Sequence, residues 1–232
     1  MLYFLLQTCY TCSMKNSFKQ FKNGFTLAEV LITLVIIGVV AAMTIPTLVN
    51  NTQKQELVSG LKKANSVLSQ AVYKIGQNKG YPVGDYSFFN DADFADEFAK
   101  VISVTKKCNS FVACFGKDGV NQHTFLTSGA LALTDGKAVV ASDGQAFLFS
   151  VNTGKYGISQ EDEEAYIGRI LVDVNGHKNP NKLGYDTFAF YLIDKKGIIP
   201  AGNDSTANCS KSASTPGWAC TAKVLKENAI NY

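Results

Sequence analysis

Residues 22–49 read KNGFTLAEVLITLVIIGVVAAMTIPTLV, and this stretch decides how the rest of the chain can be organised. From Phe25 to Val49 its only charged residue is Glu29. As a helix rising about 1.5 Å per residue, that run would be roughly 37 Å long, enough to cross a hydrocarbon core of about 30 Å. A carboxylate near the start of such a span is costly, and residues of this kind usually serve a function. The stretch therefore predicts one membrane-spanning helix in which Glu29 has a specific role.

The start of the stretch joins a basic leader to an apolar run through a glycine. Three lysines precede Gly24, and the sequence FTLAE follows at residues 25–29. This arrangement resembles the N-terminal segment of type IV prepilins and type II secretion pseudopilins, and Pro46 lies where that family often carries a proline. The resemblance is strong over residues 15–50. It implies cleavage after Gly24 by a prepilin peptidase, methylation of Phe25, and assembly into a filament through the helix.

Glu29 needs a partner if it lies inside the apolar span. Cleavage would give Phe25 an α-amino group that is positively charged near neutral pH. Phe25 and Glu29 are four residues apart, so they would share a helix face and could pair within one chain. The resemblance implies instead that Glu29 meets the amine of the next subunit and sets the axial register, with Pro46 as a second assembly residue. The remaining interpretation is that Glu29 only reaches interfacial water.

Composition and charge predict four segments. These are a prepilin leader at 1–24, a transmembrane and assembly helix at 25–49, an amphipathic helix at 50–80, and a globular head with disulfides at 81–232. The head carries 14 basic and 17 acidic residues, hence a net charge of −3 (14 − 17), which is no electrostatic footprint for nucleic acid.

The first 13 residues, MLYFLLQTCYTCS, are apolar and stand in front of the basic leader. Because MKNSFKQFKNG from Met14 already resembles a complete prepilin leader, we expect translation to start at Met14 rather than at Met1. A Sec-type signal peptide is the rival interpretation, but its apolar core should follow basic residues.

An apolar stripe with helical spacing continues after the span. Its members recur at steps of three and four: Leu57, Leu61, Ala64, Leu68, Ala71 or Val72, and Ile75. The stripe could bind a neighbouring subunit, but we expect it to pack on the protein's own head. Pro46 between the two halves would remove a hydrogen bond and favour a kink.

The head pattern predicts an α+β fold in which the long helix packs on a small antiparallel sheet. Residues 81–134 look irregular except for a short helix at Asp91–Val101. Asp135-Gly136 and Asp143-Gly144 are hairpin-turn dipeptides that bracket a strand at Lys137–Ala141. Further strands are expected at Gln145–Val151, Tyr166–Val174, Phe188–Ile193 and Gly197–Pro200.

Four cysteines lie in the head: Cys108, Cys114, Cys209 and Cys220. Neither pair has the spacing of a zinc or redox site, and His123 and His177 join no ligand cluster. An even number outside the membrane indicates disulfides in an oxidising compartment, with three connectivities open. We expect the sequence-local pairs, and the loop near the C-terminus resembles the disulfide-bounded region of many pilins. Free buried thiols are the alternative.

The segment VDVNGHKNPNKLGYD at 172–186 is a dense polar cluster. Asp173, Asn175 and Asp186 could supply oxygens to calcium, which some pseudopilins bind in their heads. The segment is not an EF-hand, because the twelfth residue from Asp173 is Gly184 rather than glutamate. Since Asp, Asn, Gly and Pro also build tight turns without metal, we expect a structural turn and keep calcium as the alternative.

No enzyme motif is present: the chain has no phosphate-binding glycine loop, no GxSxG elbow and no zinc-protease helix. We therefore expect a structural pilin or pseudopilin subunit and no cofactor other than that calcium. It would pass once through the bacterial cytoplasmic membrane with its head outside the cytoplasm, and its partners would be the peptidase, other subunits and the membrane. The alternatives are a membrane-anchored binding module that never polymerises and a minor tip subunit for adhesion or DNA uptake.

Overall fold

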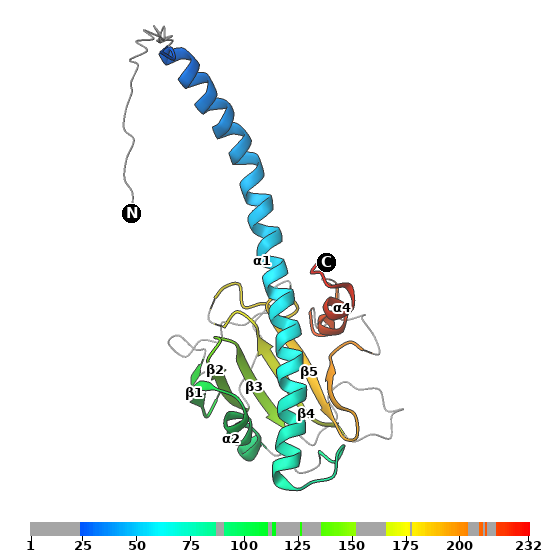
Figure 1. The fold of residues 1–232 in the computed structure, drawn as a ribbon. Coiled ribbons are helices and arrows are strands. Elements are labelled where there is room, and N and C mark those ends of the chain that lie inside the picture. The colour runs from blue at the N-terminus through cyan, green and yellow to red at the C-terminus, as the bar shows by residue number, and fades with distance from the viewer. Residues whose placement is uncertain are drawn as a thin grey trace, which may run out of the picture. The chain divides into compact units, whose positions relative to one another are not determined.

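The computed structural model describes residues 24–86, 91–110, 113–114, 126, 136–151, 166–176, 178–203, 209–210, 212 and 217–232. The chain divides into two compact units, and the boundary between Thr47 and Leu48 falls inside the long helix α1 (Leu27–Lys79). In chain order the elements after α1 are α2 (Asp91–Val101), β1 (Val104–Cys108), β2 (Lys137–Ala141), β3 (Ala146–Val151), β4 (Tyr166–Asp173), β5 (Thr187–Ile193), β6 (Gly197–Pro200) and α4 (Cys220–Glu227). The fold is α+β, a long N-terminal helix followed by an antiparallel sheet, as the sequence predicts (Figure 1).

Helix α1 changes character along its length. Its large apolar residues up to Val49 are exposed, whereas the stripe from Leu57 to Ile75 is buried. The stripe joins one hydrophobic core with residues of α2 and the sheet, which confirms the expected packing of this half on the protein's own head. Pro46 lies within the helix, which runs unbroken from Leu27 to Lys79.

The six strands form one antiparallel sheet in chain order, β1 to β6 (Figure 1). Neighbouring strands are joined by successive antiparallel pairings, for example Phe147 with Val172 and Ile170 with Phe190. Because side chains alternate across a strand, β3 and β5 present aromatic residues to the face that α1 and α2 cover. The rings of Phe94 and Phe98 lie 4.7 and 4.9 Å from that of Phe149.

The opposite face of the sheet is also buried. It carries Leu148 and Leu171 in a second cluster with the first disulfide, and Trp218 packs at its margin. Burial on both faces explains why β3 (AFLFSV) and β5 (TFAFYLI) are nearly continuous apolar runs rather than alternating ones.

Two elements were not expected from the sequence. Strand β1 lies in the region predicted to be irregular; three of its five residues, VTKKC, are exposed, so it has no apolar pattern to signal a strand. Helix α4 lies in the cysteine-bounded C-terminal region and buries only Cys220, Thr221 and Val224. The sequence also suggests Phe88, Phe89, Phe111, Phe115 and Phe125 as core residues of the head, but these lie outside the described residues.

Candidate functional site

The N-terminal end of α1 is capped by reciprocal hydrogen bonds between Thr26 and Glu29. The Thr26 backbone N–H and its hydroxyl both donate to Oε2 of Glu29, each at 2.8 Å. The Glu29 N–H donates in return to Oγ1 of Thr26 at 3.2 Å. This is a capping box, in which two residues three apart satisfy backbone donors that a helix start would leave unpaired. Gly24, Phe25 and Thr26 consequently stand outside the helix, which begins at Leu27.

The capping box gives Glu29 a partner within its own chain, Thr26, in place of the partners expected from the sequence. The expected pairing with a Phe25 amine requires cleavage, and the expected contact with a second subunit requires assembly; both stay predictions. The signal for Thr26 was nevertheless present in the sequence, because Thr-x-x-Glu directly before an apolar run is the signature of a capping box.

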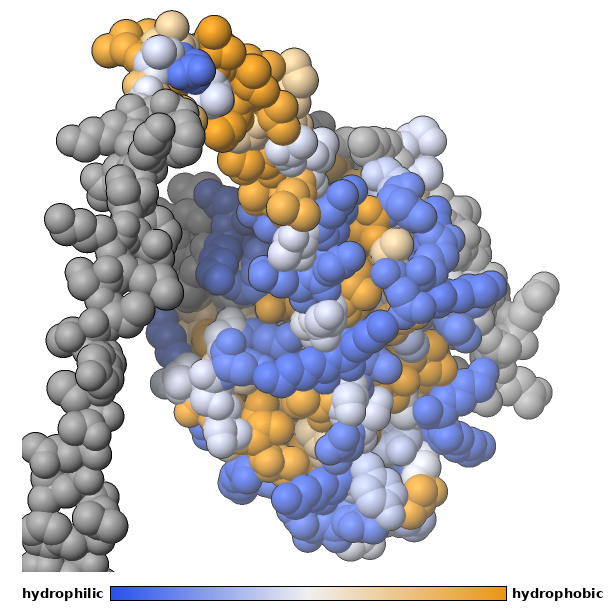
Figure 2. All heavy atoms as spheres, turned by 45° about the horizontal axis from the view of Figure 1, so that its top comes forward, coloured by the Kyte–Doolittle hydropathy of each residue, from blue (hydrophilic) through white to orange (hydrophobic). Residues whose placement is uncertain are grey.

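The first half of α1 presents apolar side chains on all sides. Leu27 is 78% exposed, and Leu34 and Ile37 are 60% and 63% exposed. Figure 2 shows this part of the helix as a largely hydrophobic surface. By length and composition α1 can cross a membrane. The hydroxyls of Thr33 and Thr44 donate to backbone carbonyls of the preceding turn, at 2.9 and 3.0 Å, so they add few unpaired polar groups to the span.

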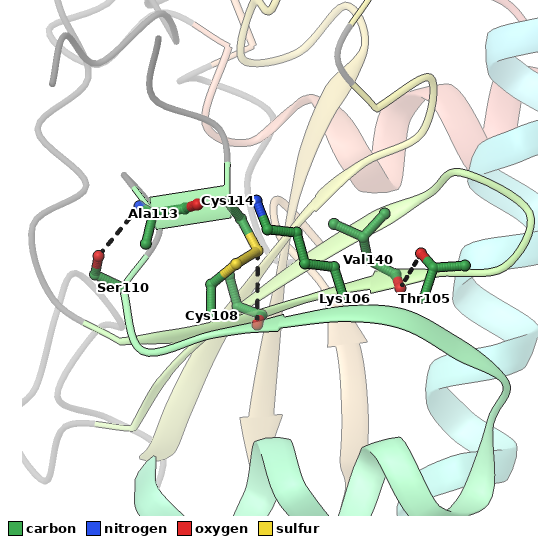
Figure 3. The surroundings of a disulfide bond; sticks show 8 residues. Thr105, Lys106, Cys108, Ser110, Ala113, Cys114 and Val140 are labelled. Carbon is green, nitrogen blue, oxygen red and sulfur yellow. Dashed lines mark hydrogen bonds between the residues drawn. A yellow bond between two sulfur atoms is a disulfide. The ribbon is translucent and has the colours of Figure 1, made fainter. Parts of the chain in front are cut away.

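The first disulfide joins Cys108, the last residue of β1, to Cys114 (Figure 3). Both cysteines are buried, and Sγ of Cys114 lies 3.9 Å from the carbonyl oxygen of Ala138 in β2. The loop between them is held by the Ala113 N–H, which donates to Oγ of Ser110, and by the Lys106 ammonium, which donates to the Ala113 carbonyl. The bond therefore fixes an edge of the sheet.

The second disulfide joins Cys209 to Cys220, the first residue of α4. Both sulfurs are buried in a small cluster with Leu126 and Ala219. The two bonds are the sequence-local pairs, the connectivity expected from the sequence.

The β4–β5 loop brings Asp173, Asn175 and Asp186 together. Oδ2 of Asp186 accepts hydrogen bonds from the Asn181 N–H at 2.8 Å and from the Asn175 side-chain amide at 3.3 Å. Its Oδ1 accepts from the Lys182 N–H, and Oδ1 of Asp173 accepts from the Asn175 N–H. Both carboxylates are buried. Together these bonds fold the loop around the Asp186 side chain.

The oxygen atoms of this loop can be compared with the ligands that a calcium ion needs. Calcium takes six to eight oxygen ligands, and the buried Oδ1 atoms of Asn175 and Asn181 have no hydrogen-bond partner. The Asp186 oxygens, however, already face three N–H donors. Within the described ranges no group of three His, Cys, Asp or Glu side chains is placed to hold a metal. The hydrogen bonds favour the turn interpretation, and calcium at Asp173, Asn175 and Asp186 stays a hypothesis.

Burial raises the pKa of Asp186 to about 6, and the nearby Asp173 carboxylate acts in the same direction. The N–H groups of Lys182 and Asn181 oppose this rise but do not cancel it. The ionised Asp186 carboxylate therefore destabilises the folded head at neutral pH.

A cavity of about 630 Å³ lies between the second half of α1 and the β4–β5 loop, in the second compact unit. Its lining includes Gln53 and Glu56 from α1, Lys178, Lys182 and Tyr185 from the loop, and Tyr232. No nucleophile–base pair is formed by these residues. His123, His177 and the acidic run at 161–164 lie outside the described residues, as does the leader before Gly24.

Comparison with known proteins finds similarity at the N-terminal segment. Residues 19–45 match the family model described as a prokaryotic N-terminal methylation motif. The chain is 38% identical over 64 residues to the type II secretion system core protein G of Pectobacterium carotovorum subsp. carotovorum, covering 26% of this chain and 39% of that protein. It is 36% identical over 67 residues to the protein of the same name from Aeromonas hydrophila, covering 28% of this chain and 45% of the relative.

The chain thus spans less than half the length of these curated relatives. No solved structure gives a significant match. The similarities are to structural proteins of pilin type, in agreement with the prediction that the chain is not an enzyme.

Proposed function

We propose that this prepilin-like chain is a structural subunit of a type II secretion pseudopilus or of a related type IV pilus. It is made as a precursor, cut between Gly24 and Phe25 by a prepilin peptidase, and joined to other pilin-type subunits through residues 25–49. Before assembly it is anchored in the bacterial cytoplasmic membrane by α1, with the head outside the cytoplasm. The motif match and the similarity to type II secretion core protein G support this proposal.

The observation that carries the proposal is the setting of Gly24. A Cβ added at Gly24 would meet nothing within 4 Å, and its φ is not in the left-handed region. Folding therefore gives no reason for a glycine at this position. Because Gly24 and Phe25 also lie outside the helix, the bond between them is free to enter the active site of another protein.

The exposed apolar half of α1 supports an anchoring and assembly role. A soluble protein rarely exposes an apolar surface of this length, so the segment calls for lipid or neighbouring subunits. The two disulfides of the head support its location in an oxidising compartment, outside the cytoplasm.

Processing is the first test. Mass spectrometry of the membrane-purified protein should give a mature chain that begins at Phe25. Gly24→Val should leave the precursor uncut, because a branched side chain would crowd a site that accepts glycine. Gly38→Val is the matched control, since Gly38 also has open surroundings but lies away from the bond. An intact leader on the wild-type protein would refute the proposed processing.

Assembly is the second test. Glu29→Leu removes the one charge between Phe25 and Val49, so membrane insertion should persist while the subunit is lost from sheared filaments. Variant subunits that enter filaments at wild-type levels would contradict a register role for Glu29. A wild-type protein that is found only in the envelope would favour the alternative of an anchored module that does not polymerise.

A further inference from the structure

The cavity between α1 and the β4–β5 loop is lined by side chains of both charges. Its charged residues are Glu56 of α1, Asp143 of the β2–β3 turn, and Lys178 and Lys182 of the β4–β5 loop. The two acidic groups thus come from the helix and the turn, whereas both basic groups come from the loop. All four residues belong to the second compact unit, so this lining does not depend on how the two units are oriented.

The protein itself neutralises only part of this charge. The Asp143 carboxylate lies 2.7 Å from the Lys63 ammonium. Among the residues that the structure describes, by contrast, no ion pair involves Glu56, Lys178 or Lys182. One carboxylate and two ammonium groups therefore line the cavity without an ion-pair partner from the described part of the chain. A ligand that carries both an anionic and a cationic group would supply partners of both signs.

The uncharged lining of the cavity is suited to peptide groups. Gln53 and Asn179 are exposed residues of the lining, and each has a side-chain amide that can both donate and accept hydrogen bonds. Tyr185 and Tyr232 add aromatic surface to the lining. The volume of about 630 Å³ lies within the range of small-molecule sites.

The charges of the lining also argue against other kinds of ligand. An apolar ligand would take three charged groups out of water without pairing them, which is costly. A ligand with several negative charges would meet the Glu56 and Asp143 carboxylates. A single amino acid would leave most of the cavity unfilled, whereas an extended tripeptide separates its ammonium and its carboxylate by roughly 10 Å. A short peptide therefore fits the size of the cavity as well as its charges.

We propose that this cavity binds short peptides with free termini. The Lys178 and Lys182 ammonium groups bind the terminal carboxylate, and the Glu56 carboxylate accepts hydrogen bonds from the terminal ammonium. The amides of Gln53 and Asn179 pair with the peptide groups between the termini. Binding of this kind adds recognition to the structural role of the subunit. It concerns the head alone and depends neither on cleavage of the leader, nor on membrane anchoring, nor on polymerisation.

The test uses the full chain in detergent and three mixtures of tripeptides. The first mixture has free termini, the second has amidated C-termini, and the third has acetylated N-termini. Peptides retained by the protein are measured by mass spectrometry. Amidation should weaken retention by about tenfold or more, because it removes the charge that two lysines bind, and acetylation should weaken it several-fold. Equal retention of the three mixtures, or no retention of the free peptides, would overturn the proposal.

Variants of the cavity separate charge recognition from folding. Lys178→Gln with Lys182→Gln should remove the preference for a free carboxylate and keep the preference for a free ammonium, and Glu56→Gln should do the reverse. Misfolding would remove both preferences together. Lys74→Gln with Lys195→Gln is the matched control, because both are exposed lysines that do not line the cavity. The assignment would be refuted if the two double variants gave the same result, or if Glu56→Gln still discriminated against acetylated peptides.

Discussion

The two halves of α1 are built from one continuous helix but meet opposite surroundings. Between Leu27 and Val49 the large apolar side chains are exposed, and between Leu57 and Ile75 the apolar stripe is buried against the sheet. Exposed positions of the second half are polar, for example Ser59, Lys62 and Gln70. The difference shows that apolar content alone does not bury a helix. A uniformly apolar stretch needs lipid or other subunits around it, whereas a stripe repeating every three or four residues needs only one covering surface.

The largest loss of stability should come from truncating a side chain of the buried stripe. Leu68 is fully buried, so Leu68→Ala should lower the free energy of unfolding of the head by about 2–5 kcal/mol through lost burial and an unfilled cavity. Leu34→Ala makes the same change at a 60% exposed position and should leave head stability unaltered. Urea unfolding in detergent, followed by the fluorescence of Trp218, gives both values. Equal destabilisation by the two variants would contradict the division of α1.

Much of this division could be predicted from the sequence. The apolar run and the three-four periodicity can each be recognised from neighbouring residues in the sequence. The β2–β3 hairpin likewise follows from the turn dipeptide Asp143-Gly144. Strand β1 could not be foreseen, because its exposed lysines carry no strand pattern and its place depends on pairing with β2. Short α4 depends likewise on tertiary contacts, since its buried Val224 packs in the core that α1 and the sheet share.

The candidate site shows the same limit. Gly24, Phe25 and Glu29 could be named because the motif is local, and Thr26 could have been named by its capping signature. That Asp186 organises its loop could not be predicted, because its hydrogen-bond partners depend on the backbone path of residues 173–187. The burial of the second sheet face could not be predicted from the sequence either, since it depends on segments distant in sequence.

A second prediction concerns the loop that packs against the buried half. The Val174 N–H donates to the Asp186 carbonyl, and Val174 borders Gly60 of α1. The pKa of Asp186 rises from 3.8 to about 6 on folding, so the folded state binds more protons than the unfolded state between these values. Head stability contributed by this group should therefore fall as pH rises from about 4 to 6, by about 3 kcal/mol in total.

Comparison with Asp186→Asn isolates that contribution. The difference in unfolding free energy between wild type and variant should change over this pH window and stay constant above it. A pH-independent difference would show that Asp186 is not held in this environment. Adding a chelator at neutral pH then tests calcium: an unchanged melting temperature supports the turn, whereas a loss seen in wild type but not in Asp186→Asn would establish a bound ion.

The smallest effect should come from Gly38 and Gly60, one glycine from each half of α1. A Cβ at Gly60 would lie 3.2 Å from Cβ of Val174 and 3.5 Å from the side-chain amide of Gln145, whereas a Cβ at Gly38 would meet nothing within 4 Å. The Gln145 amide also donates to the Gly60 carbonyl at 2.9 Å, so a larger residue would disturb a contact between helix and turn.

Gly60→Leu should accordingly destabilise the head by about 1–3 kcal/mol, the usual cost of overpacking, despite the better helix propensity of leucine. Gly38→Leu should not change head unfolding in detergent, since its surroundings are open. The same urea titration with Trp218 fluorescence measures both. If Gly60→Leu proved as stable as wild type, α1 and the β4–β5 loop would be less closely packed than the buried stripe indicates. If Gly38→Leu lowered head stability, the first half of α1 could no longer be treated as independent of the head.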